Sequence, residues 1–285
     1  YLPEWGVVLD AGVAVKTITP KCVLLSHGHR DHTQALSVLA RANPFKRTPQ
    51  GSPEPAPKVL LPQKLEPLVR QFLVSESILN FGSEEAYETV QTQWFGADHN
   101  DGLDLHPVAD GDVIHLPRHC HSGAFKDLAV EVYAAPHKGL PAVAFGFFRV
   151  NKKLKPEYRD QQHRIREILA EAPGTELTEE VRENLLFYSG DTTIELLQSR
   201  ASEILEYRYI IHEVTFIGPP SKDLDEQAHS RGHTHYAQLH PFICAAPQTV
   251  FILVHFSIRY TREDVEAFFE EQYGGVPCNV VLWIK

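Results

Sequence analysis

The sequence predicts an α/β fold in which two β-sheets pack together inside outer layers of helices. Short apolar runs typical of buried strands recur along the chain, and segments with helical spacing of apolar residues follow strands near both ends. This order of strands and helices is typical of sheets covered by helices on their outer faces. No repeat period and no linker divides the chain, so we predict one domain over residues 1–285, with a charged, helix-prone insertion at about 151–184.

Each expected element follows from a local pattern. Strands are expected at 7–12, 21–26, 59–61, 128–134, 142–150, 185–189, 209–212, 249–255 and 279–284. Helices are expected at 65–79, 157–171, 178–184, 193–206 and 261–273. The last helix has the clearest ends, because Thr261 and Asp264 have the spacing of a capping box and Gly274 follows as a stop signal.

Composition limits the class of protein. The 285 residues are 43% hydrophobic, which suits a large core, and no apolar stretch is long enough to span a membrane. The four cysteines lack CxxC spacing and no signal-peptide pattern opens the sequence, so we expect an intracellular, reducing compartment. The net charge of −10 means that a polyanionic partner would need a local basic patch or a bound metal.

One six-residue stretch, 27–32, predicts a metal site. It carries the pattern HxHxDH directly after the apolar run that ends at Ser26. His27 and His29 are two apart in extended chain, so both rings can face one ion. Asp31 and His32 follow where the helical pattern begins, and they can face a neighbouring ion. Imidazole and carboxylate at this spacing are ligand types that zinc prefers.

Three more ligand types follow expected strands. His137, Asp191 and His255 each come just after an apolar run, where loops on a rigid sheet carry functional groups. One such residue alone would be an ordinary polar strand end, but together they complete two coordination shells. We therefore predict two divalent ions, with Zn²⁺ as the expected metal. The assignment gives the first ion His27, His29 and His137, the second ion Asp31, His32 and His255, and makes Asp191 a bridge between them.

Two ions held close together predict hydrolytic chemistry. A pair of divalent ions can acidify a shared water and clamp a phosphodiester, so no strong side-chain base is needed. Asp31 has a second, catalytic role in this prediction, because its carboxylate can accept the hydrogen bond that aims the attacking hydroxide. Arg259 and Lys138 are candidates for neutralising a phosphate oxygen, although either can equally be a surface charge.

The motifs, in this order, resemble the metallo-β-lactamase superfamily and within it the ribonuclease Z branch, the tRNA 3′-processing endonucleases. The segments that carry the resemblance are LDAG at 9–12, HGHRDH at 27–32, 137–141, SGDT at 189–192, HEVTF at 212–216, GHTH at 232–235 and HFSIRY at 255–260. The resemblance implies an αββα sandwich, two zinc ions and phosphodiester hydrolysis. It also implies that His233 donates a proton to the leaving oxygen and that Glu213 orients it. His235 stands where the branch has a small residue, which makes it the second candidate.

The substrate is less closely specified. The resemblance implies RNA, and in particular precursor tRNA, but the interval before Asp191 lacks the Gly-Pro-rich arm of tRNA-processing members and begins instead with the basic segment 152–155. A hydrolase of a small molecule, such as a cyclic nucleotide, a thioester or a sulfate ester, is the alternative. A non-catalytic scaffold is the third hypothesis, and the full ligand set opposes it. No membrane partner is expected, and a homodimer is compatible with this interpretation.

Overall fold

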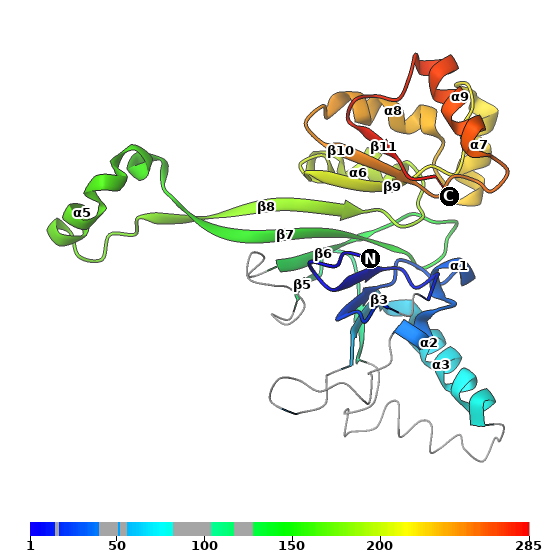
Figure 1. The fold of residues 1–285 in the computed structure, drawn as a ribbon, viewed down its shortest axis with the longest axis horizontal. Coiled ribbons are helices and arrows are strands. Elements are labelled where there is room, and N and C mark those ends of the chain that lie inside the picture. The colour runs from blue at the N-terminus through cyan, green and yellow to red at the C-terminus, as the bar shows by residue number, and fades with distance from the viewer. Residues whose placement is uncertain (15–16, 40–50, 52–55, 82–103, 117–127, 285) are drawn as a thin grey trace.

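Two sheets form the centre of the computed structural model, which describes residues 1–14, 17–39, 51, 56–81, 104–116 and 128–284 (Figure 1). The N-terminal sheet is parallel and has the order β1-β2-β3-β4, with strands Val7–Leu9, Cys22–Leu24, Lys58–Pro62 and Asp104–Val108. The C-terminal sheet is mixed and has the order β11-β10-β9-β8-β7-β6-β5. Its strands, from β5 to β11, are Val113–His115, Leu128–Ala134, Val143–Leu154, Thr178–Tyr188, Tyr209–Glu213, Val250–Val254 and Val280–Leu282.

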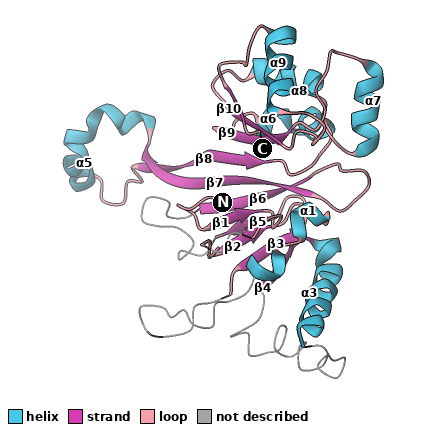
Figure 2. Ribbon diagram, turned by 45° about the vertical axis from the view of Figure 1, so that its right-hand side comes forward, coloured by secondary structure: helices cyan, strands magenta, loops and turns pink. Residues whose placement is uncertain are grey.

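Helices cover the outer face of each sheet (Figure 2). On the N-terminal side these are α1 (Arg30–Thr33), α2 (Leu36–Leu39) and α3 (Glu66–Phe81), the last preceded by the short 3₁₀ helix η1 (Gln63–Leu65). On the C-terminal side they are α6 (Glu195–Ile204), α7 (Lys222–Arg231), α8 (Tyr236–Ala245) and α9 (Arg262–Tyr273). Within the described ranges, no helix is both long and apolar enough to cross a membrane.

Three buried apolar clusters confirm the predicted layers. In the N-terminal sheet, Val23 and Val59 pack with residues of α2 and α3 on one face, whereas Leu24 and Leu60 pack on the other face against Phe145 and its neighbours in the C-terminal sheet. This alternation is the period of two that strand geometry imposes. The third cluster lies between the C-terminal sheet and helices α6, α8 and α9. The order of layers is therefore helix, sheet, sheet, helix, as expected.

The insertion differs from its prediction. Residues 178–184 are not a helix but the first part of β8, which pairs along its length with β7 from Leu154↔Thr178 onward. The β7–β8 hairpin projects from the body and carries a helical tip, the 3₁₀ segment η5 (Pro156–Arg164) followed by α5 (Ile165–Glu171) (Figure 1). Cross-strand pairing decided the conformation of 178–184, and a short local pattern does not contain that information.

Two helices were missed by the sequence analysis. Helix α7 is almost entirely polar, so it has no apolar stripe to recognise, although Ser221 caps its first turn through a bond from the Leu224 amide. Helix α8 contains Pro241, which normally signals a helix boundary. Helix α7 ends at Arg231, and only Gly232, whose carbonyl bonds to His137, separates it from His233.

Candidate metal centre

The predicted ligands converge at one edge of the two sheets, where strands end. Strands β8, β9 and β10 are parallel, and β6 runs in the same direction because β7 is antiparallel to both of its neighbours. Their C-terminal ends therefore meet at one edge, where they place His137, Asp191, Glu213 and His255. The loop after β2 supplies 27–32 from the opposite sheet. Ligands far apart in sequence are thus brought together by parallel strand geometry.

The first group contains the ligands predicted for one ion. One ligand atom from each of His27, His29, His137 and Asp191 lies within 4.8 Å of the others. Nε2 of His27 is 3.0 Å from Nδ1 of His29, and Nε2 of His137 is 3.3 Å from that same atom. The three nitrogens therefore face a common point.

The second group lies next to the first and shares Asp191 with it. Asp31, His32 and His255 form a group by the same 4.8 Å criterion. Oδ2 of Asp191 lies 3.4 Å from Nε2 of His32, 3.3 Å from Nε2 of His255 and 3.7 Å from Nε2 of His27. A single carboxylate oxygen thus faces histidines of both groups, as expected of a bridging ligand.

Hydrogen bonds on the outward nitrogens suit these histidines for metal binding. Nδ1 of His137 is bonded to the carbonyl of Gly232 at 2.7 Å, and Nδ1 of His32 to Asp10 at 2.6 Å. Nδ1 of His27 and of His255 face the hydroxyls of Ser26 and Thr215. A ligating histidine normally donates its second ring N–H to such a partner, which leaves the other nitrogen with a lone pair for the metal. The donor set therefore fits a divalent ion of the zinc type.

The side chains of the cluster differ in the protonation state that their surroundings favour. Burial and the neighbouring His32 lower the pKa of His27 to about 3, so its ring is neutral and can act as a ligand. Burial opposes protonation of His32 too, but hydrogen bonds and charges from Asp10 and Asp191 outweigh it and raise its pKa to about 10. Burial would raise the pKa of Asp191, yet the surrounding histidines lower it, so it stays a carboxylate.

His233 borders the cluster and is tied to Glu213. Its Nδ1 lies 2.9 Å from Oε1 of Glu213, and its ring stacks on His255 at a centroid distance of 5.4 Å. Glu213 is fully buried and also accepts the backbone amides of Thr234 and Thr215. Burial lowers the pKa of His233, but the bond and charge of Glu213 more than compensate, so the pKa is raised. A protonated ring at this position can donate from Nε2.

His235, the second candidate for the proton donor, has both ring nitrogens bonded to groups outside the cluster. It is fully buried, its Nδ1 bonds to Asp225 at 2.7 Å and its Nε2 to the carbonyl of Gly218 at 3.1 Å. Both nitrogens are therefore used in holding the loop before α7. Of the histidine pair in GHTH, the geometry gives only His233 access to the cluster.

Backbone geometry around the cluster is unusual. His255, Asp10 and Lys138 have positive φ angles of 61°, 55° and 46°, a conformation that costs a non-glycine residue free energy and gathers at functional sites. Gly190, with φ of 58°, lies so close to Ser26 that an added Cβ would approach Cβ of that serine to 2.5 Å. The chain before Asp191 therefore needs a glycine to bring the two sheets together here.

The cationic candidates lie on exposed loops near the cluster. Arg259 is exposed, and its guanidinium lies 5.0 Å from the ring centroid of Phe216 and 5.1 Å from that of Tyr260. Lys138 is exposed and follows the ligand His137 directly. Neither side chain belongs to the buried core.

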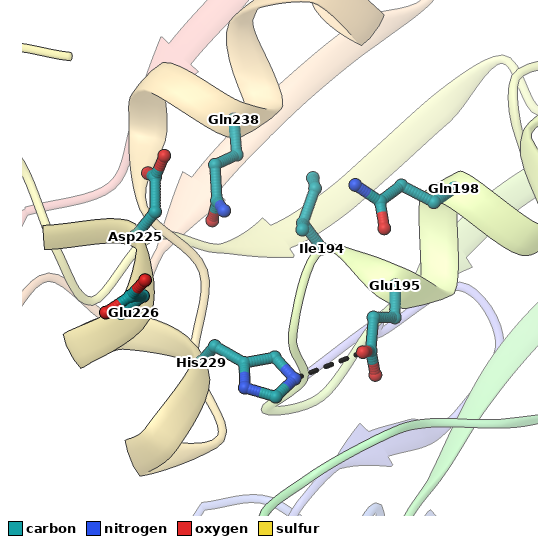
Figure 3. A pocket seen from close by; sticks show the side chains of 7 residues that line it. All are labelled: Ile194, Glu195, Gln198, Asp225, Glu226, His229 and Gln238. Atoms are coloured by element: carbon teal, nitrogen blue, oxygen red, sulfur yellow. Dashed lines mark hydrogen bonds and ion pairs between the residues drawn. The ribbon is translucent and has the colours of Figure 1, made fainter. Parts of the chain in front are cut away.

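A separate pocket lies between residues of α6, α7 and α8 (Figure 3). Its volume is about 260 Å³, and none of the predicted ligands lines it. His229 pairs there with Glu195 at 3.1 Å. The pocket is distinct from the His/Asp cluster, and we assign no chemistry to it.

Sequence reasoning missed several partners of the ligands. Asp10, after β1, accepts bonds from Ser26, His32 and Tyr188, although the sequence marked it only as a member of the LDAG motif at a strand end. Ser26 directly precedes the candidate ligand His27, and Thr215 belongs to the HEVTF motif, but neither position indicates which histidine its hydroxyl contacts. Such partners are found only when the fold brings them together.

Comparisons with known proteins agree with this geometry. No protein-family model matches the chain. The chain superimposes on the metallo-β-lactamase fold protein YhfI from Bacillus subtilis with a TM-score of 0.53 and 12% identity, over 98% of this chain and 84% of that one. The chain has the metallo-β-lactamase fold. A crystal structure of a diphosphatase from the PhnP family shares this fold, with a TM-score of 0.54 and 11% identity over 98% of this chain and 77% of the other.

Relatives by sequence lie within the branch that the motifs indicate. The chain is 25% identical over 282 residues to "tRNase Z TRZ2, chloroplastic" of Arabidopsis thaliana, covering 98% of this chain and 70% of that protein. It is 22% identical over 268 residues to "tRNase Z TRZ1" of the same plant, covering 93% and 82%. These two relatives confirm the resemblance to the ribonuclease Z branch of proteins with the metallo-β-lactamase fold.

Proposed function

We propose that this protein is a metal-dependent endoribonuclease of the tRNase Z type, which hydrolyses a phosphodiester near the 3′ end of precursor tRNA. The observation that carries the proposal is the His/Asp cluster at the strand ends, with Glu213 and His233 beside it. The two tRNase Z relatives, which match nearly the whole chain, support RNA as the substrate.

The residues that hold the metal are those of the two adjacent groups. His27, His29 and His137 would hold one ion and Asp31, His32 and His255 the other, and Asp191 would be available to both. Zinc is the proposed metal because imidazole and carboxylate make up the whole donor set. When bound, the pair of ions lowers the pKa of water toward neutrality and neutralises phosphate charge. Asp31, whose side chain is 68% exposed, accepts the hydrogen bond that aims the nucleophile.

His233 supplies the proton that the leaving group needs. An alkoxide leaves slowly unless it is protonated as the bond breaks. His233 keeps its proton because Glu213 raises its pKa, and its Nδ1 is fixed by that carboxylate, so Nε2 is the donating atom. Lys138 and Arg259, on exposed loops that border the cluster, neutralise the non-bridging oxygens of the substrate.

The projecting β7–β8 hairpin is the proposed RNA-binding element. It leaves the C-terminal sheet and ends in the tip formed by η5 and α5 (Figure 1). Lys152, Lys153 and Arg166 are exposed, and no described ion pair uses them. These exposed cations are the proposed phosphate contacts of the hairpin, at a distance from the cluster.

One pair of assays tests the proposal. Metal-loaded protein is incubated with a 3′-extended precursor tRNA and, separately, with a chromogenic bis(aryl) phosphodiester. We expect endonucleolytic loss of the 3′ extension together with hydrolysis of the diester. Hydrolysis of the diester with the RNA left intact would instead favour a small-molecule hydrolase, and hydrolysis of neither would favour a non-catalytic scaffold. The location of the protein in an intracellular, reducing compartment and its assembly as a homodimer are still predictions from the sequence.

A further inference from the structure

Two buried carboxylates next to the cluster have the same pattern of hydrogen bonds. Asp10 is 8% exposed and Glu213 is fully buried. Each bonds directly to Nδ1 of one histidine, His32 for Asp10 and His233 for Glu213. Each also bonds to the hydroxyl of a short side chain that contacts Nδ1 of another histidine. The two arrangements lie in opposite sheets and do not share a residue.

On the N-terminal side the connecting hydroxyl belongs to Ser26. Its Oγ lies 2.8 Å from Oδ2 of Asp10 and 3.0 Å from Nδ1 of His27. A carboxylate can only accept, so the hydroxyl hydrogen of Ser26 points to Asp10. Toward His27 the oxygen must then accept, which places the imidazole proton on Nδ1. The amide of Ser26 and the hydroxyl of Tyr188 also donate to Asp10, at 2.6 Å and 2.5 Å, and hold this carboxylate in place.

On the C-terminal side the connecting hydroxyl belongs to Thr215. Its Oγ1 lies 2.7 Å from Oε2 of Glu213 and 2.9 Å from Nδ1 of His255. By the same argument Thr215 donates to the carboxylate and accepts from His255. The proton of His255 is therefore on Nδ1 as well, and Nε2 faces Asp191 at 3.3 Å.

We propose that Ser26 and Thr215 are positioning residues that each extend a buried carboxylate to a metal-binding histidine, Ser26 to His27 and Thr215 to His255. Each hydroxyl fixes the ring orientation and the tautomer that leaves Nε2 available. Since His27 and His255 belong to different ions in the proposed assignment, each hydroxyl supports one ion. Glu213 thereby serves both the proton donor His233 and a ligand of the neighbouring ion. The inference rests on the proposed function in one respect, because it requires that the protein binds metal.

Removal of each hydroxyl by itself tests this role. The variants are Ser26→Ala and Thr215→Val, of which the second keeps the shape of the side chain. Zinc affinity is measured by competition with a chromogenic chelator that resolves two binding steps. We expect each variant to weaken one step by about 10- to 100-fold, as is typical when a partner of a ligating histidine is lost, and the double variant to weaken both.

Matched controls separate positioning from general stability. Ser37→Ala removes a buried serine hydroxyl that donates to Glu76 at 2.8 Å, and Thr249→Val removes a buried threonine hydroxyl that donates to the carbonyls of Leu205 and Tyr207. Both controls should lower the melting temperature without changing either zinc affinity. The inference is wrong if wild-type protein binds two ions and the Ser26 and Thr215 variants bind them as tightly.

A second measurement needs no metal. Long-range ¹H–¹⁵N NMR spectra of the metal-free protein distinguish the two neutral tautomers of histidine. We expect His27 and His255 to carry their proton on Nδ1, and each should lose this preference only in the variant that removes its own hydroxyl. If both rings are protonated on Nε2 in the wild type, the inference is overturned whatever the chelator titration shows. If the wild type binds no zinc but the tautomers are as expected, the proposed function fails and the hydrogen-bond assignment stands.

Discussion

The Nδ1 atom of His137 and the carbonyl oxygen of Gly232 lie 2.7 Å apart, and this bond joins the loop after β6 to the end of α7. Gly232 ends α7 in the left-handed conformation, with φ of 79°, and its amide bonds back to the helix. An added Cβ there would lie 2.9 Å from Nδ1 of His137 and 2.7 Å from the amide nitrogen of Lys138. The helix end and the predicted ligand therefore have to fit each other closely.

Replacing Gly232 by alanine should thus affect both stability and metal binding. Gly274 offers a matched control, since it ends α9 with φ of 69° and its added Cβ would meet nothing within 4 Å. We expect Gly274→Ala to cost about 1 kcal/mol of unfolding free energy, as is usual for a left-handed glycine, and to leave zinc binding unchanged. Gly232→Ala should cost more and also weaken zinc binding. Equal losses of stability and unchanged zinc affinity in both variants would show that the contact with His137 is unimportant.

Asp191→Ala should remove metal and activity together. Its Oδ2 faces histidines of both groups, so its loss opens both coordination shells and leaves the buried rings without their shared counter-charge. Elemental analysis of the purified variant measures the metal directly. Asp112→Ala, at an exposed turn where the carboxylate accepts the Ala109 amide, is the control and should keep its zinc. Retention of two zinc ions per chain in the Asp191 variant would defeat the bridging assignment.

His233→Ala should leave the metal in place and slow cleavage according to the leaving group. Loss of a general acid typically costs about 10²- to 10⁴-fold in rate, and the loss is felt most where the leaving oxygen is basic. We therefore expect a large effect on RNA and a small one on an activated bis(aryl) phosphodiester. His229→Ala, on the exposed side of α7 where it pairs with Glu195, should have neither effect. Rates that fall equally on the two substrates would exclude the proton-donor role.

Shortening the β7–β8 hairpin should separate RNA cleavage from phosphodiester chemistry. Asn151 and Val181 face each other in the register of the two strands, so residues 152–180 can be replaced by an Asn-Gly turn that suits a two-residue hairpin. We expect the shortened protein to hydrolyse the chromogenic diester at the normal rate and to lose most of its activity on precursor tRNA. Normal cleavage of the RNA would mean that the hairpin has no part in substrate binding.

The sequence predicts the part of this fold that depends on local patterns. Strand β6 matches its expected bounds of 128–134, and α9 begins and ends where Thr261 and Gly274 indicate. Each of the predicted ligands ends or follows a strand, and strand ends are visible in sequence as a polar residue after an apolar run. Parallel strands then bring those ends to one edge. This is why the sequence could predict that these separate stretches of chain lie close together.

The remaining features depend on tertiary contacts. Residues 178–184 form a strand because β7 lies beside them, and α8 tolerates Pro241 because its neighbouring residues Leu239 and Ile243 are buried in the core. The contacts of Asp10 with Ser26 and His32 span 16 and 22 residues of sequence, and nothing in the local pattern indicates them. Sequence reasoning therefore finds the candidate ligands more readily than the groups that hydrogen-bond to them.

The proposed chemistry requires that these histidines and aspartates hold a pair of metal ions on which hydrolysis depends. Elemental analysis of the purified protein, followed by removal of metal with a chelator and stepwise return of zinc, measures this directly. We expect two zinc ions per chain, loss of phosphodiester hydrolysis in the metal-free protein, and recovery as the second ion binds. A protein that holds no zinc, or that hydrolyses the diester equally well after the metal has been removed, would contradict this expectation.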